Sequence, residues 1–247
     1  MGLLCSIRQR MVKVIFHKRT WLTLLLLLCI KALYAQALIA VLFGGKIKNQ
    51  HIKLGVLVGA TGSWITETES QQPRIGVALG AYTAYVLNEK WEVCMYIVAK
   101  SPKGGKSINY ENSFIVPEDT ALVNTSFNRW ITYINAAPVI RYKLTPSFAL
   151  ALGPQVAARA RSTDIYEHST DQGKLSYHYN SKDYIHRLDA GAVFDAQYTM
   201  MKGKGMRLNL QYYWGLTNLY KDNPAGLRGS NQQFILSVGI PIGTTGN

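Results

Sequence analysis

The segment WITYINAAPVIRYKLTPSFALALGPQVAARAR, residues 130–161 of the 247-residue chain, decides the fold. It contains two runs in which mostly apolar and mostly polar positions alternate, and the turn signal Thr145-Pro146-Ser147 separates them. The apolar positions are the even ones, from Trp130 to Leu144 and again from Phe148 onward. A period of two residues over this length excludes a helix, so we expect two long antiparallel strands joined by a tight turn.

The other face of this hairpin carries small residues and a few charges, among them Asn135, Arg141, Gly153 and Gln155. Such a face suits the crowded, hydrated interior of a barrel better than an open sheet surface in solvent. The apolar face must then point outward. A continuous outward apolar band is tolerated only in lipid, where a closed barrel satisfies every backbone hydrogen bond. The hairpin therefore predicts a membrane-spanning β-barrel.

The start of the chain has the organisation of a secretory signal peptide. Five basic residues precede an apolar run at 21–30, and the small residues Ala35 and Ala37 follow it. The run is much shorter than the roughly 20 apolar residues of a spanning helix. We predict a cleaved leader over 1–35 that starts at Met1 or Met11, a periplasmic segment over 36–50 and a barrel over 51–247. An uncleaved anchor is the alternative.

Charge and cysteine content exclude several functional classes. The full chain has a formal charge of +13, and the predicted leader holds six Lys or Arg and no acidic residue, so the mature chain retains +7. A mild basic excess spread over loops and lumen gives no reason to expect a nucleic-acid partner. Cys94 is the sole cysteine of the predicted mature chain, which excludes an intramolecular disulfide and a cysteine metal cluster.

The two-residue period continues along the chain and predicts eight strands. Their expected ranges are 52–65, 74–87, 91–100, 130–144, 148–161, 184–200, 206–219 and 231–242. Tight turns at 88–90, 145–147 and 201–205 alternate with longer connections at 67–73, 102–128, 162–183 and 220–230. Outer-membrane barrels have short periplasmic turns and long external loops. We therefore expect an all-β, eight-stranded antiparallel up-and-down transmembrane barrel in the bacterial outer membrane.

Outward aromatic side chains gather at both ends of the predicted strands. The expected periplasmic girdle consists of Tyr85, Trp91, Tyr142, Phe148 and Tyr198, and the expected external girdle consists of Trp64, Trp130, Tyr184 and Trp214. Aromatic girdles mark the two membrane–water interfaces. They favour a lipid-embedded barrel over a soluble lipocalin-like barrel, which would leave its small-residue face in water.

Charged residues on the inward face are expected to pair, because an unpaired buried charge is costly. Glu92 begins the third strand, and Arg141 and Lys143 end the fourth, so antiparallel pairing brings them to similar depth. Asp195 and Arg207 are expected to meet in the same way across the turn at 201–205. The inward set also includes Asp189 and the bulky residues Tyr82, Tyr96, Lys100, Tyr133, Arg159, Arg161, Arg187 and Tyr213. This bulk predicts a filled, closed interior.

No pattern in the sequence indicates a catalytic residue, a cofactor or a metal. The expected loop at 162–183 holds Asp164, Glu167, His168, Asp171 and His178, but their spacing matches no established ligand pattern, so a solvated polar loop is the simpler interpretation. His186 is expected on the outer face of a strand, with no evident nucleophile or orienting carboxylate beside it. Cys94 faces the lumen and is interpreted as a small filler. We do not expect an enzyme.

Four segments resemble the PorT-like outer-membrane β-barrel proteins of Bacteroidetes. They are QALIAVLFGGK at 36–46, the run at 134–143 with Pro138 in mid-strand, LGP at 152–154 and GLTNL at 215–219. The resemblance extends over nearly the whole predicted mature chain and implies an eight-stranded outer-membrane barrel. The namesake of the family is linked to a protein secretion and gliding apparatus. Most members have no assigned activity, so the resemblance carries over no functional residue.

These features predict a non-enzymatic barrel that acts as an anchor, a scaffold or an accessory component of a secretion or surface apparatus. Its partners would be outer-membrane lipid and an envelope protein bound through the external loops, of which 102–128 is the longest. Loops of that length are usually functional or disordered. A narrow pore and a small-ligand-binding barrel are the alternatives.

Overall fold

The computed structural model describes residues 52–68, 71–114, 125–170, 173–203, 205–221 and 226–242. The predicted leader over 1–35 and the predicted segment over 36–50 lie outside these residues, and both stay predictions. Within the described ranges, no helix is long and apolar enough to cross a membrane.

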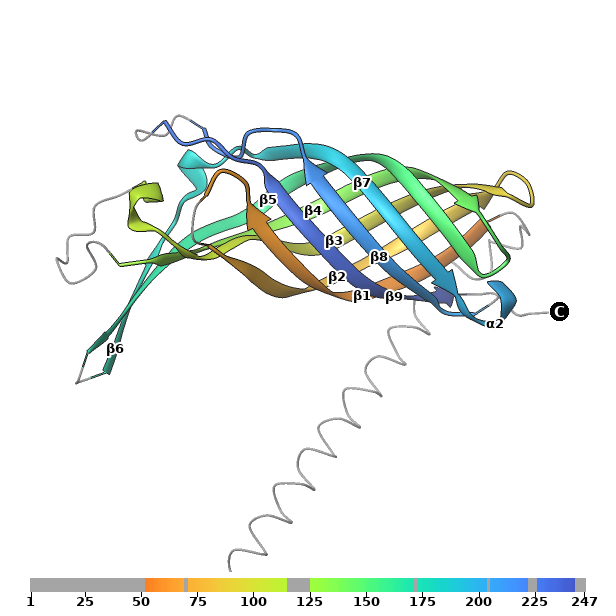
Figure 1. Ribbon diagram of the computed structural model, residues 1–247, viewed down its shortest axis with the longest axis horizontal. Coiled ribbons are helices and arrows are strands. Elements are labelled where there is room, and N and C mark those ends of the chain that lie inside the picture. The colour runs from red at the N-terminus through yellow and green to blue at the C-terminus, as the bar shows by residue number, and fades with distance from the viewer. Residues whose placement is uncertain are drawn as a thin grey trace, which may run out of the picture. The chain divides into compact units, whose positions relative to one another are not determined.

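The described residues form nine β-strands (Figure 1). They are β1 (Ile52–Ile65), β2 (Gln72–Val86), β3 (Trp91–Ile108), β4 (Phe127–Lys143), β5 (Phe148–Thr170), β6 (Gly173–Tyr179), β7 (Leu188–Thr199), β8 (Arg207–Gly215) and β9 (Asn231–Ile242). The short helical turns η1 (Tyr110–Asn112), η3 (Lys182–Tyr184) and α2 (Met200–Gly203) lie between strands. We call the end of the barrel with the connections at 87–90, 144–147 and 200–206 the turn end, and the opposite end the loop end.

Eight of the strands close into a ring of antiparallel neighbours. Their order is β4-β3-β2-β1-β9-β8-β7-β5, and pairing between β4 and β5 joins the two ends of this sheet. β1 pairs with β9 from Leu54↔Ile242 to Ile65↔Asn231, so the first strand of the ring closes on the last. The predicted eight-stranded, all-β barrel is therefore confirmed. β6 pairs with β5 outside the ring, and Figure 1 shows this hairpin extending away from the barrel.

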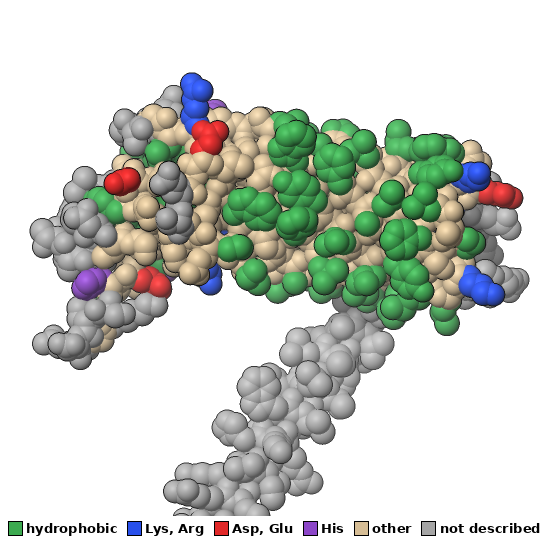
Figure 2. All heavy atoms as spheres, viewed as in Figure 1, with side chains coloured by type: hydrophobic (Ala, Val, Ile, Leu, Met, Phe, Trp, Pro, Cys, Tyr) green, Lys and Arg blue, Asp and Glu red, His purple; other side chains and the backbone are tan. Residues whose placement is uncertain are grey.

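The ring strands divide their side chains between inside and outside as the two-residue period predicts. In β1, Thr61 and Ser63 are buried whereas Val58 is exposed, and in β9 Ser237 is buried whereas Leu236 is exposed. Figure 2 shows apolar side chains covering the visible wall of the barrel, thinning toward the loop end, with charged side chains near both ends. An outward apolar wall of this kind is stable in lipid.

Inward glycines let neighbouring strands approach closely. A Cβ atom on Gly153 of β5 would meet the carbonyl oxygen of Pro138 on β4, and a Cβ atom on Gly191 of β7 would meet the carbonyl oxygen of Trp214 on β8. Both obstacles are backbone atoms, which cannot swing aside as a side chain can. The small inward residues therefore permit the tight curvature of a small barrel, in addition to leaving space in the lumen.

Near the loop end, β-bulges reverse which side chains of β3 and β5 point into the lumen. The register shifts in the β3–β4 pair at 98–101 and in the β4–β5 pair at 159–161. One extra residue in a strand moves every later side chain to the opposite face. Lys100 and Arg161, which an unbroken period places in the lumen, are therefore exposed, and Lys103 points inside instead.

The strand ends differ from the predicted ranges mainly at the loop end. β3 continues to Ile108 and β5 to Thr170, so much of the connections predicted at 102–128 and 162–183 is strand. In contrast, β7 begins at Leu188, which leaves His186 and Arg187 exposed before the strand rather than on it, and β8 ends at Gly215. A strand ends where its neighbour stops supplying hydrogen-bond partners. The alternation of apolar and polar residues within one strand does not show where its neighbour ends.

Candidate functional site

Glu92 is the centre of a charged cluster at the turn end. The β3–β4 register places Glu92 opposite Arg141, so their inward side chains lie at one depth. Arg141 Nη1 donates to Glu92 Oε2 at 3.0 Å, while Lys143 Nζ and Lys53 Nζ lie 2.9 Å and 3.0 Å from Oε1. The three residues that the sequence placed at similar depth are thus in contact. Lys53 joins them from β1, which is separated from β3 only by β2, and sequence reasoning did not anticipate this contact.

Asp195 lies deeper in the lumen and binds Tyr96. The Tyr96 hydroxyl donates to Asp195 Oδ2 at 2.6 Å and accepts a hydrogen bond from Arg141 Nη2. The predicted contact between Asp195 and Arg207 is wrong, because the β7–β8 register pairs Asp195 with Gln211, four residues beyond Arg207. Four residues of a strand span roughly 13 Å, and the ion pairs of the described residues do not include Asp195 with Arg207.

Asp189 is the centre of a second cluster, in the loop-end half of the lumen. Its carboxylate accepts hydrogen bonds from Lys103 Nζ at 2.9 Å, from the Tyr213 hydroxyl at 2.7 Å and from Asn231 Nδ2 at 3.0 Å. Lys103 Nζ also lies 3.5 Å from the centroid of the Tyr213 ring, within the range of a cation–π interaction. The sequence placed Asp189 inside but missed Lys103. Pro102 was the available signal, because proline within a strand often marks a bulge.

Arg129 and Asp164 form the centre of a third charged cluster, at the loop end. Arg129 Nη2 lies 2.6 Å from Asp164 Oδ2, both side chains are fully buried, and Ser181 Oγ donates to Oδ1 at 3.1 Å. Asp164 was considered above as a ligand in a polar loop, but it lies in β5 and its oxygens are held by protein donors. Among the described residues, no group of three His, Cys, Asp or Glu is placed to hold a metal ion. Asp171, the other aspartate of that set, lies outside them.

Apolar side chains close the loop end around this ion pair. We call this cluster the seal: Ile65, Ile108, Phe114, Phe127, Ile131, Tyr133, Ala157, Tyr166, Ile185, Leu219 and Tyr220. The rings of Phe127 and Tyr166 stack at 5.1 Å, and the ring of Phe114 lies 4.0 Å from the Arg129 guanidinium. Each large apolar side chain buried here stabilises the fold by about 1.5–3 kcal/mol. The loop end is therefore closed by a packed core.

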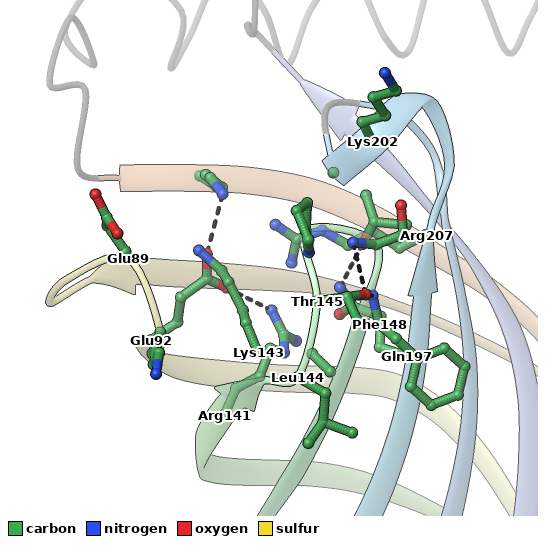
Figure 3. Close-up of a pocket in the computed structure, with 17 residues that line it drawn as sticks. Glu89, Glu92, Arg141, Lys143, Leu144, Thr145, Phe148, Gln197, Lys202 and Arg207 are labelled. Atoms are coloured by element: carbon green, nitrogen blue, oxygen red, sulfur yellow. Dashed lines mark hydrogen bonds and ion pairs between the residues drawn. The ribbon is translucent and has the colours of Figure 1, made fainter.

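The turn end is hollow. A cavity of about 430 Å³ lies between the tight turns and the Glu92 cluster. Figure 3 shows Glu92, Arg141 and Lys143 on one side of this cavity and Arg207 with Gln197 on the other. The interior is thus sealed at one end and open to solvent at the other.

All but one of the residues predicted for the two aromatic girdles point outward, near one end or the other of the barrel wall. The Trp91 and Tyr142 rings lie 4.8 Å apart, and Trp64 packs against Phe234 at 5.7 Å. The other outward members are Tyr85, Trp130, Phe148, Tyr198 and Trp214. The prediction for Tyr184 is wrong, because β7 begins after it: Tyr184 lies in η3 and stacks on Phe114 of the seal at 4.9 Å.

The residues considered for catalysis are dispersed. Cys94 is buried in the lumen, and His186 is exposed before β7. On β6, Ser176 Oγ lies 3.1 Å from His178 Nε2, but both side chains are exposed on the hairpin. A serine nucleophile needs a base that a third group orients, in a site that excludes water. The exposed hairpin does not provide such a site.

A family model described as outer membrane protein beta-barrel domain matches residues 48–221. No curated protein matches the chain. Among solved structures, the attachment invasion locus protein Ail of Yersinia pestis is 12% identical with a TM-score of 0.40, over 78% of this chain and 99% of Ail. Neisserial surface protein A is 11% identical with a TM-score of 0.37, over 76% and 96%. OprG from Pseudomonas aeruginosa is 11% identical with a TM-score of 0.36, over 77% and 93%.

The family match extends over well more than half of the chain. The ring of eight antiparallel strands and the outward apolar wall are the architecture that such a match implies. The protein therefore lies in the bacterial outer membrane, crosses it with its strands, and belongs to the family of outer membrane protein beta-barrel domains.

Proposed function

We propose that the protein is a closed, non-enzymatic outer-membrane anchor that presents its loop-end surface to an envelope or surface partner. In this proposal it is an accessory component of a secretion or surface apparatus, as the resemblance to PorT-like proteins implies. The observation that supports closure most strongly is the interior, where buried ion pairs and a packed seal occupy the path from the Glu92 cluster to the loop end.

The charged clusters succeed one another along the lumen. The largest side chains that are fully buried include Arg141, Tyr96, Lys103, Tyr213 and Arg129, which together extend from the turn end to the loop end. The interior of an eight-stranded barrel is just wide enough for side chains to fill. A solute would have to displace paired charges whose separation in a buried setting is costly. This argues against the narrow-pore alternative and against a ligand cavity through the centre.

The loop end offers a surface for a partner. A tilted strand of about 9–11 residues crosses the membrane, whereas β5 has 23 residues and continues into the hairpin with β6. The hairpin therefore extends beyond the membrane. Leu175 and Tyr177 on β6 are 39% and 43% exposed, and exposed apolar side chains on a strand outside the lipid are typical of a contact surface.

Closure is tested by electrical recording on the full chain reconstituted in planar bilayers. We expect no steady conductance, because the Lys103–Asp189 and Arg129–Asp164 pairs occupy the lumen. The matched measurement uses the Lys103→Ala/Asp189→Ala double variant, in which intermittent conductance is expected as the lumen loses side-chain volume. Steady ion flow through the unmodified protein would instead support the narrow pore.

The partner surface is tested by a photo-crosslinking residue placed at one of two positions. Tyr177 reports the β6 hairpin at the loop end, and Met201, which is 81% exposed, reports the turn end. We expect one cross-linked envelope protein with the probe at Tyr177 and none with the probe at Met201. The reverse result would move the partner to the periplasmic rim and contradict the proposal.

A shortened hairpin completes this test. Glu167 pairs with Ser176, so a two-residue Asn-Gly turn in place of 168–175 should leave the Arg129–Asp164 pair intact. Folding should survive and the cross-link should be lost. The β5–β6 hairpin is shortened rather than the connection predicted at 102–128, because that connection includes Lys103. Lys103 is buried in the Asp189 cluster, and its removal would damage the barrel itself.

A further inference from the structure

The cavity at the turn end has a strong excess of positive charge. Its lining includes six basic residues, Lys53, Lys90, Arg141, Lys143, Lys202 and Arg207. The acidic residues of the lining are Glu89 and Glu92. Glu92 already binds three of the cations, so its single charge is more than balanced. The cavity therefore attracts anions from the periplasmic side.

Arg207 is a buried cation of this cavity whose guanidinium is not fully hydrogen-bonded. It is 5% exposed, and no described carboxylate forms an ion pair with it. Its Nη1 atom has no hydrogen-bond partner among the described residues, and its guanidinium carbon lies 4.5 Å from the centroid of the Tyr82 ring. A buried charged donor without an acceptor is costly and rare in folded proteins. Figure 3 shows Arg207 among the side chains that line the cavity.

The surroundings of Arg207 provide further donors. Gln197 also lines the cavity, but its Nε2 already donates to Thr199 Oγ1 at 2.6 Å, so the lysines are the available donors. Lys143 and Lys53 are 23% and 28% exposed in their pairs with Glu92, so each can turn toward a second anion. Lys202 of the α2 turn also lines the cavity, and Figure 3 shows its side chain directed away from Arg207, so it contributes charge at longer range. Donors from several strands thus converge on one space, which suits the four oxygens of a tetrahedral anion.

We infer that this cavity binds a phosphate group, with Arg207 as its principal ligand and the lysines of the mouth as auxiliary charges. Arginine recognises phosphate through two parallel N–H donors, and lysine recognises it as a point charge. Two sources share this chemistry: the headgroup of a periplasmic-leaflet phospholipid and a soluble phosphate compound of the periplasm. Phe148 lines the cavity and also belongs to the aromatic girdle, so the mouth lies at headgroup depth. The inference is independent of the partner proposed at the loop end.

The test measures binding to the purified full chain in a non-ionic detergent by isothermal titration calorimetry. One titration uses inorganic phosphate, and the other uses mixed micelles that contain short-chain phosphatidylglycerol. We expect Arg207→Gln to weaken binding at least tenfold, and Arg207→Lys to weaken it less because the charge is kept. The matched control is Arg161→Gln, an exposed arginine at the opposite end, which should leave binding unchanged.

The outcomes separate the sources and can overturn the inference. Binding of both probes supports a soluble phosphate ligand, and binding of the micelles alone supports a lipid headgroup. If neither probe binds, or if Arg207→Gln binds as tightly as the unmodified protein, the cavity is only hydrated and the inference is wrong. If Arg207→Gln does not show the heat-dependent gel shift of a folded barrel, Lys202→Gln on the turn replaces it, with about threefold weaker binding expected. Unchanged binding in that variant would equally contradict the inference.

Discussion

Replacement of Glu92 by alanine tests whether the lumen charges hold the barrel together. Glu92 is the shared acceptor of Arg141, Lys143 and Lys53, at 3.0, 2.9 and 3.0 Å. Arg141 is fully buried, and without Glu92 it would keep the Tyr96 hydroxyl as its hydrogen-bond partner. The variant therefore leaves a buried guanidinium without its carboxylate.

The expected loss of stability follows from the exposure of the three cations. Removal of one partner from a buried ion pair costs about 3–5 kcal/mol, and this applies to Arg141. Lys143 and Lys53 are 23% and 28% exposed, so they can turn to water, and pairs of that kind contribute at most about 1 kcal/mol each. We expect Glu92→Ala to lower the free energy of unfolding by about 4 kcal/mol, with Arg141 as the main cause.

The assay is urea unfolding of the protein refolded into lipid vesicles, followed by tryptophan fluorescence and by heat-dependent gel mobility. Glu89→Ala is the matched control, because it removes the same charge from an exposed position on the adjacent turn. The Glu92→Ala/Arg141→Met double variant removes both charges and should recover most of the lost stability. The reasoning is refuted if Glu92→Ala unfolds at the same midpoint as Glu89→Ala, or if the double variant is no more stable than Glu92→Ala.

Three further predictions concern other parts of the chain. Asp164→Ala should lower the free energy of unfolding by about 3–5 kcal/mol, because it leaves a fully buried guanidinium unpaired, whereas Asp183→Ala on the exposed η3 turn should leave the urea midpoint unchanged. Gly153→Ala should abolish refolding on gels, since its Cβ would meet the backbone of β4, and Gly62→Ala, whose Cβ would meet only Ile75 Cδ1 at 3.7 Å, should refold normally. Terminal sequencing of membrane-extracted protein should find a start between Gln36 and Leu38, and a start upstream of Lys31 would mean that the leader is retained.

The alternation of side chains was sufficient to predict the eight ring strands, the tight turns and most of the outward wall. Side chains on a strand point to opposite faces in turn, so the assignment of Thr61 inward and Val58 outward needs only the local sequence. The contact of Glu92 with Arg141 was also accessible, because Glu92 begins β3 and Arg141 ends β4 at the turn end, so antiparallel pairing places them at similar depth.

The tertiary structure alone decided which distant residues meet inside the barrel. Lys103 and Asp189 are 86 positions apart in the sequence, and their contact depends on a bulge in β3 and on closure of the ring. Asp195 binds Tyr96 rather than Arg207 because the stagger between β7 and β8 separates the two charges along the strands. Register, bulges and ring closure are properties of the whole sheet, since each depends on the backbone partners that neighbouring strands supply. The period of a single strand contains no information about them.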